Sequence, residues 1–181
     1  MRSRRLRAFT LVLVLVSTVS CLTHLSRAKR YYAEGQDQAR AFQTEQAVAH
    51  WRKALDEADR ECRRKPSAQA LTVKGLAEAN LGRWREAEAS FLKAFSLGFN
   101  EGEAWASDSA LAGLAASFED LGLEAPALRI YAQLVDKSDF KPALMVAAER
   151  RTNLVLARAA GLDPGEKDRT LAALVKTLDR L

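Results

Sequence analysis

Cysteine is scarce in this chain, and so are aromatic residues and runs of β-branched residues beyond the N-terminal segment. The 181 residues include two cysteines, and 7% of the residues are aromatic. Two cysteines exclude a framework of several disulfides, and no Cys or His pair has the spacing typical of a metal site. Alanine and leucine dominate the hydrophobic residues, and both enter helices at little cost. The composition therefore favours an all-α protein.

The chain also lacks the usual signatures of catalysis. No set of nucleophile, base and acid side chains is visible, and no Gly-rich phosphate loop follows a strand, since no strand is predicted. His24 and His50 are isolated, and pairs of acids such as Glu86 and Glu88 are typical of a solvated helix face. We therefore expect no enzyme, no cofactor and no metal site.

The basic character of the chain comes mostly from its first residues. The net charge is +5, but residues 1–20 carry four arginines and no acid, so the remainder is close to neutral. The short basic run 63–65 follows several acids and is typical of a solvated helix end. Nucleic-acid binding requires a basic surface on the folded part, so a nucleic-acid partner is not expected.

The N-terminus has the layout of a secretory signal peptide. An arginine-rich stretch, Met1–Arg7, precedes the unbroken, mostly apolar run Ala8–Val16, and small or modest residues lead to Cys21. The residues Thr18-Val19-Ser20-Cys21 resemble the lipobox of bacterial lipoproteins, although Thr18 replaces the usual aliphatic residue. The resemblance implies that residues 1–20 are removed and that Cys21 is lipidated.

Two alternatives to the lipoprotein interpretation remain open. Residues Ala8 to about Leu25 could form an uncleaved single span, since their length is at the short edge for crossing a bilayer. The chain could also be secreted without an anchor, and a bridge between Cys21 and Cys62 is compatible only with a non-lipidated protein. Each alternative places the folded part outside the cytoplasm.

The position after Cys21 gives a further indication of location. Leu22 is not an aspartate, which, by resemblance to Gram-negative lipoproteins, favours the outer membrane facing the periplasm. The single-span alternative implies the inner membrane. In either case we expect a signal peptide or anchor at 1–20, a tether at 21–30 and a folded domain at 31–181.

Several positions recur at a spacing of 40 residues. The recurring sets are Ala47, Ala87 and Ala127; Trp51, Phe91 and Tyr131; Ala54, Ala94 and Leu134; Gly35, Gly75 and Ala115; and, at a predicted turn, Phe42, Gly82 and Gly122. An alanine, an aromatic residue four positions later and a small or apolar residue three further on fall on one face of a helix. Three matched copies predict three equivalent helical hairpins, of which the stretch Leu71–Phe99 is the clearest.

This pattern resembles the second helix of a tetratricopeptide (TPR) repeat. The resemblance implies helical hairpins stacked as a short α-solenoid. The spacing departs from the family, whose units repeat at about 34 residues. We expect the additional length at Asp59–Pro66 and Gly98–Trp105, as longer second helices or longer connections.

Periodicity, caps and breakers predict about eight helices. They cover about 27–42, 45–64, 67–81, 83–97, 103–121, 124–137, 142–161 and 165–181. Thr44 is predicted to cap the second helix. The last two helices do not match the repeat spacing and are expected to form a diverged fourth hairpin that closes the core.

The TPR resemblance also implies a concave binding face formed by the first helix of each hairpin. The residues expected there are Tyr32, Gln36, Arg40, Gln69, Thr72, Leu76, Asn80, Ser109, Ala112, Ala116 and Glu119. These positions are mostly uncharged, which argues against a clamp for a peptide C-terminal carboxylate. Trp51 and Trp84 occupy repeat positions and are expected to pack between hairpins.

The sequence therefore favours a membrane-tethered scaffold that binds a protein partner on the extracytoplasmic side. The combination of TPR-like repeats and a lipoprotein-like signal resembles TPR lipoproteins that assist the assembly of envelope complexes, such as secretin pilotins. The alternative is a periplasmic protein that binds a small ligand or glycan in the concave groove.

Overall fold

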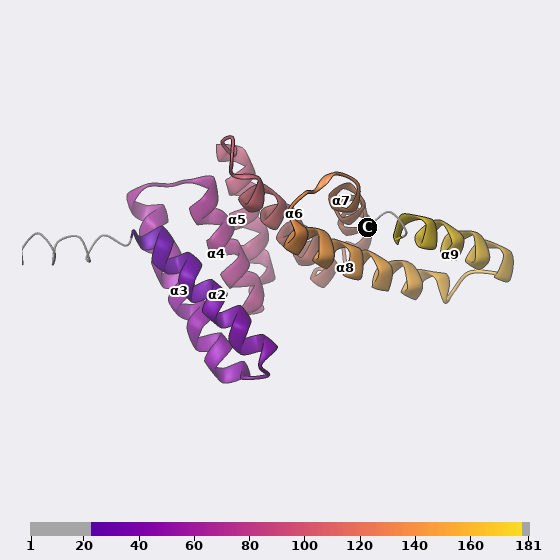
Figure 1. Cartoon of the computed structure of the whole chain (residues 1–181), viewed down its shortest axis with the longest axis horizontal. Helices are drawn as coiled ribbons and strands as arrows, with labels where there is room; N and C mark the ends of the chain where they lie inside the picture. The colour runs from indigo at the N-terminus through magenta and orange to yellow at the C-terminus, as the bar shows by residue number, and fades with distance from the viewer. Residues whose placement is uncertain (1–22, 179–181) are drawn as a thin grey trace, which may run out of the picture.

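The protein is described by a computed structural model, and the structure describes residues 23–178. The predicted signal segment and Cys21 lie outside this range. Within it the chain forms eight α-helices and no strand, which confirms the predicted all-α class (Figure 1). The helices are α2 (His24–Arg40), α3 (Thr44–Arg64), α4 (Ala68–Asn80), α5 (Trp84–Leu97), α6 (Ala104–Asp120), α7 (Glu124–Lys137), α8 (Lys141–Ala159) and α9 (Pro164–Leu178).

Consecutive helices pair as hairpins, and the hairpins follow one another in chain order. In Figure 1 the chain passes from the indigo α2–α3 pair at one side to the yellow α9 at the other. The first helices α2, α4, α6 and α8 also contact one another in succession, so they form a continuous row. The architecture is a short α-solenoid, in which each hairpin buries its apolar faces against its neighbours.

The first three hairpins share one turn. Phe42, Gly82 and Gly122 all adopt a left-handed conformation, with φ of 59°, 73° and 77°. In each case the turn residue's N–H donates to a carbonyl three residues back, and the next residue's N–H donates five residues back. This pairing satisfies carbonyls at the helix end, and glycine is the residue that adopts the conformation without strain.

The recurring alanines and aromatic residues form the centre of each hairpin. Ala47, Ala87 and Ala127 are fully buried. Phe91 and Tyr131 are also fully buried, and Trp51 is nearly so. The alanines let the first helix approach closely, and the aromatic ring fills the space between the helices. The positions matched by their spacing therefore have matching environments.

Phe91 lies in the tightest part of the core. A β-carbon added at Gly75, on the same hairpin, would stand 2.6 Å from the Phe91 ring, and one added at Gly113 of α6 would also collide with it. Two glycines from two hairpins therefore make room for one ring. Gly35 has the same role toward Trp51 in the first hairpin. Gly35 and Gly75 thus allow close contact within a hairpin, and Gly113 allows it between two hairpins.

The observed boundaries agree with the predicted ones to within about three residues, with two corrections at the start of the fold. Helix α2 begins at His24, inside the range 21–30 that was predicted to be a tether. Thr44 is the first residue of α3, and Gln43 occupies the cap position without a side-chain hydrogen bond. The turn fixes Gln43 at the cap position, since its N–H donates to the Gln38 carbonyl and its own carbonyl accepts from the Ala47 N–H.

Both stretches expected to hold the additional repeat length do so. Helix α3 has 21 residues and continues through Arg64, whereas α5 has 14. A connector at 98–103 separates α5 from α6. The longer spacing therefore arises from the longer α3 in the first interval, and from the connector together with the 17-residue α6 in the second.

Candidate interaction surfaces

The predicted concave face corresponds to the row of first helices, and its polar groups are tied to one another. Tyr32 is half-buried, and its hydroxyl accepts hydrogen bonds from Gln36 Nε2 at 2.5 Å and from Asn80 Nδ2 at 3.3 Å. Burial raises the pKa of Tyr32, although these two hydrogen bonds oppose the shift. The structure therefore brings three of the predicted residues together across α2 and α4.

A second polar chain crosses three first helices. Lys29 Nζ donates to Gln69 Oε1 at 2.7 Å, and Gln69 Nε2 donates to Glu103 Oε1 at 2.6 Å. The Lys29 ammonium also lies 4.2 Å from the centre of the Trp105 ring, a cation–π geometry. Hydrogen bonds from the Asn100 backbone N–H and from Gln69 lower the pKa of Glu103 despite some burial. Gln69 thus joins α2 to the start of α6 and is half-buried by these contacts.

Two predicted binding residues on α4 belong to packing contacts instead. Thr72 is fully buried, and its hydroxyl donates to the Ala68 carbonyl at 2.9 Å and to the Ala106 carbonyl at 3.4 Å. The prediction that Thr72 faces a partner is wrong, because α6 approaches α4 closely at this small residue. Leu76 is half-buried and packs against the core around Phe91.

The predicted residues on α6 lie in several environments. Ser109 and Ala116 are half-buried, whereas Ala112 is buried in the α6–α8 core. Glu119 accepts from the Tyr131 hydroxyl at 3.0 Å and from Arg150 Nη1 at 3.2 Å. Burial and the neighbouring Glu119 carboxylate both raise the pKa of Tyr131. Glu119 therefore connects α6 to α7 and α8.

The two tryptophans at repeat positions pack as predicted. Trp51 is buried against Gly35, and Trp84 is half-buried beside the core around Phe91. Both rings therefore contribute to packing. Trp105, whose role the sequence leaves less determined, lies beneath the Lys29 ammonium.

The tip of the first hairpin, residues 37–44, exposes an aromatic side chain. Phe42 is 93% exposed and has a φ of 59°, whereas the equivalent positions in the next two hairpins are glycines. Arg40 stands near it on the surface and forms an ion pair with Asp37 at 2.9 Å. Its position at the end of the hairpin makes this tip available to another molecule.

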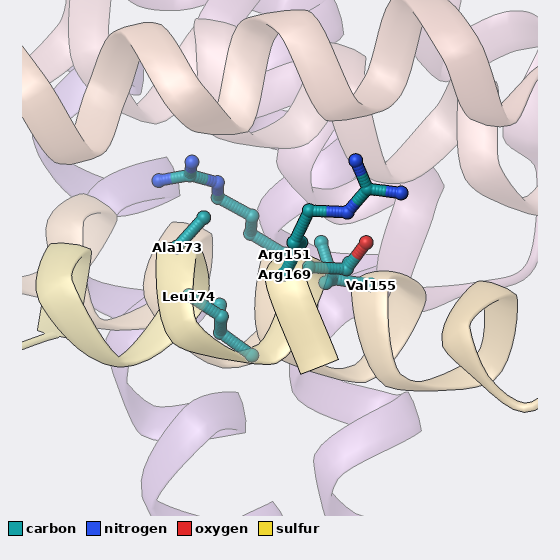
Figure 2. Close-up of a pocket in the computed structure, with 6 residues that line it drawn as sticks. Arg151, Val155, Arg169, Ala173 and Leu174 are labelled. Carbon is teal, nitrogen blue, oxygen red and sulfur yellow. The ribbon is translucent and has the colours of Figure 1, made fainter. Parts of the chain in front are cut away.

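Two adjoining hollows open where α8 meets α9. The first, of about 370 Å³, is lined by Arg151, Val155, Arg169, Thr170, Ala173 and Leu174. The second, of about 390 Å³, is lined by Leu128, Val155, Arg158, Leu162 and Thr170. Figure 2 shows the side chains of Arg151 and Arg169 diverging from each other. Because Val155 and Thr170 line both hollows, the two form one groove, which we term the α8–α9 groove.

Sequence reasoning did not find the α8–α9 groove. One signal was nevertheless present, because Arg151, Val155 and Arg158 lie at spacings of four and three, on one face of α8. That spacing does not reveal that α9 leaves the face open. The separation of the two helices depends on how the last hairpin packs.

A comparison with known protein families, curated proteins and solved structures finds no match to this chain. In the part of the chain that the structure describes, none of the helices combines the length and apolarity needed to cross a bilayer. Residues 23–178 likewise contain no cluster of three or more His, Cys, Asp or Glu side chains suited to a metal ion. The functional argument therefore depends on the surfaces described above.

Proposed function

We propose that this chain is a membrane-tethered, TPR-like scaffold that binds a protein partner on the extracytoplasmic side and assists the assembly of an envelope complex. The lipobox-like residues before Cys21 support the tether. The stacked hairpins support a binding role, because such arrays present extended surfaces to partners. Binding centres on the tip of the first hairpin and includes the neighbouring Gln36 and Arg40.

The observation that carries this proposal is the conformation of Phe42. A non-glycine residue in the left-handed region costs roughly 1–2 kcal/mol. An aromatic side chain that is 93% exposed gains little from burial in return. Glycine occupies the equivalent turn in the next two hairpins, so the fold itself does not require an aromatic residue there. A strained, exposed aromatic residue is understandable as an anchor that enters a pocket on a partner.

Replacement of Phe42 separates folding from binding. Phe42→Gly should raise the free energy of unfolding by about 0.5–1 kcal/mol, because glycine relieves the strain. The same variant, displayed on nanodiscs in an envelope extract, should lose the partner that the wild-type chain captures. Phe42→Asn should also lose the partner, because asparagine tolerates the turn but lacks the ring. Quantitative mass spectrometry of the captured proteins provides the measurement.

A matched control uses a second exposed apolar residue. Leu92 on α5 is 49% exposed and lies in a regular helix, so Leu92→Ala should capture the partner as the wild type does. If Phe42→Gly retains every protein that the wild type captures, the binding role of the tip is wrong. If ligand-induced thermal shifts with envelope glycans appear while no protein is captured, the small-ligand alternative is favoured.

The tether has an independent test. Cells fed a tagged palmitate should label the wild-type protein, and Cys21→Ser should abolish the label. An unlabelled wild type would rule out the lipoprotein interpretation. In that case, an intact mass that retains residues 1–20 would support a single span, and a mass without them would support secretion.

A further inference from the structure

The α8–α9 groove carries positive charge that is unbalanced within the described chain. Arg151, Arg158 and Arg169 line the two hollows, and no Asp or Glu does. Within residues 23–178 none of these three arginines forms an ion pair. The nearby Arg150 provides a contrast, since it pairs with Glu119 at 3.2 Å. The groove therefore gathers three arginine charges with no carboxylate among its lining residues to balance them.

One of the three cations is also partly withdrawn from water. Arg151 Nη1 is buried and has no hydrogen-bond partner among the residues that the structure describes. A sheltered donor without a partner destabilises the fold, and a charged one does so more. Because Arg151 also lines the first hollow, a carboxylate placed there would offset the cost of this partly buried charge. A guanidinium is well suited to that ligand because it can donate two parallel hydrogen bonds.

The floor between the arginines is apolar. Val155 lies one turn beyond Arg151 on α8, and Leu174 and Ala173 face it from α9. Leu128 and Leu162 line the second hollow. An occupant therefore needs an aliphatic face in addition to its carboxylates. A free inorganic anion would leave this apolar surface uncovered.

The spacing along α8 sets the register of the occupant. Arg151 and Arg158 are two helical turns apart, about 10.5 Å along the axis at a rise of 1.5 Å per residue. A partner helix presents the same repeat with acids at positions i and i+7 and aliphatic residues at i+3 and i+4. Such a helix would place a carboxylate near each arginine and its aliphatic side chains over Val155.

We propose that the α8–α9 groove binds an acidic amphipathic helix of a partner protein, with acids at i and i+7 directed to Arg151 and Arg158. The N-terminal segment of the same chain does not fit this groove, because residues 1–22 contain four arginines and no acid. Helix-in-groove docking is a common mode of peptide recognition. The inference rests on the proposed function only in that the chain docks a protein; the surface is separate from the Phe42 tip.

Fluorescence anisotropy with a designed peptide tests the proposal. The probe is a labelled 18-residue helix with glutamates at i and i+7 and leucines at i+3 and i+4. A second peptide of identical composition carries both glutamates on the opposite face, and a third replaces them with glutamine. The full-length chain is held in zwitterionic nanodiscs, so that lipid charge does not attract the peptide.

Matched arginine variants identify the site. The groove variant combines Arg151→Gln, Arg158→Gln and Arg169→Gln. The control variant combines Arg52→Gln, Arg83→Gln and Arg85→Gln, three exposed arginines on or beside α3 and α5 with no ion pair in the described chain. Both variants lose the same net charge, and circular dichroism melts check that both remain folded.

The expected result is register-specific binding at the groove. The first peptide should bind the wild type and the control variant with affinities within about twofold, and the groove variant about tenfold or more weakly. The two altered peptides should also bind the wild type about tenfold or more weakly. Equal binding of all three peptides, equal binding by both variants, or no binding to the wild type at about 1 mM would overturn the proposal.

Two further outcomes separate this inference from others. A concentration-dependent dimer that the groove variant abolishes would replace the partner helix with a second copy of the chain and overturn the proposal. If the peptide does not bind but partner capture still depends on Phe42, the role of the groove is wrong and the proposed function stands. If the peptide binds but partner capture does not depend on Phe42, the role of the groove is supported and the binding role of the tip is wrong.

Discussion

The central and terminal hairpins differ in how completely their neighbours enclose them. Helix α4 is buried along most of its length, and Phe91 of α5 is fully enclosed between glycines of two hairpins. In α9 the structure describes only one side chain as buried, Leu174, and Val175 is 56% exposed. A repeat with neighbours on both sides buries two faces, whereas a terminal repeat has one neighbour and leaves a face open.

The first and last hairpins differ in the partners of their charged side chains. In the first hairpin Glu57 of α3 is nearly buried, and Arg27, Arg60 and His24 surround it, with Arg27 Nε at 2.9 Å and His24 Nδ1 at 2.6 Å. In the last hairpin three groove arginines face no acid. The buried Glu57 at the start of the solenoid thus finds its counter-charges within the chain. The end of the solenoid retains charge that another molecule can satisfy.

The largest expected effect comes from removing matched core side chains. Phe91→Ala should lower the free energy of unfolding by about 3–5 kcal/mol, because it opens a cavity in an enclosed core. Leu174→Ala should lower it by about 2 kcal/mol or less, near the low end for such truncations, because the side chain already lines an open hollow. Urea denaturation followed by circular dichroism measures both. Equal losses would contradict the difference in enclosure.

An intermediate effect is expected at Glu57. Burial raises the pKa of this carboxyl, but hydrogen bonds from His24 and Arg27 outweigh burial and lower it below the ordinary value of 4.5. The ionised carboxylate therefore stabilises the fold above that value, and the stabilisation is lost as the pH falls below it. Glu57→Gln should lower stability at pH 7 by about 1–2 kcal/mol and flatten the loss of stability in acid.

Urea titrations at a series of pH values measure the Glu57 effect. Asp56→Asn is the matched control, because Asp56 is an exposed acid next to Glu57 on the same helix. The control should keep the wild-type acid profile. An unchanged profile for Glu57→Gln would show that the contacts with His24 and Arg27 contribute no net stability.

The smallest expected change in stability comes from replacing two polar side chains, one in each region. Gln69 bridges Lys29 and Glu103, so Gln69→Ala should cost about 1 kcal/mol, the net value of one or two hydrogen bonds. Thr170 lines the α8–α9 groove, and Thr170→Ala should change stability by less than about 0.5 kcal/mol. Thermal melts of the two variants measure the difference. A larger loss for Thr170→Ala would show that the terminal hairpin is more tightly coupled than its open groove indicates.

Periodicity and turn chemistry predicted most of the fold because they act over a few residues. Recurring alanines and aromatic residues identified the buried faces, and the alignment of Phe42 with Gly82 and Gly122 identified the turns. The repeat spacing aligns Phe42 with the two glycines, but it does not predict that Phe42 adopts their left-handed conformation. A bulky residue is a poor candidate for a left-handed turn.

The contacts that sequence reasoning missed join residues far apart in the chain. His24 is predicted to be isolated, yet it contacts Glu57, which lies 33 positions later. Thr72 was placed on an open face because the period identifies the face of a helix but not how closely the next first helix approaches. The α8–α9 groove was missed for the same reason. These features depend on tertiary packing, which local spacing does not encode.

The contact between Glu57 and the start of α2 has a mechanical consequence. Helix α2 begins only three residues after Cys21, and three extended residues reach at most about 10 Å. If Cys21 carries the lipid, the linker between the lipid and the first hairpin is too short to let the hairpin rotate freely. Because His24 and Arg27 fasten the beginning of α2 to the middle of α3, the membrane would then set the orientation of the whole stack. The directions from which a partner can approach would be limited before any binding contact forms.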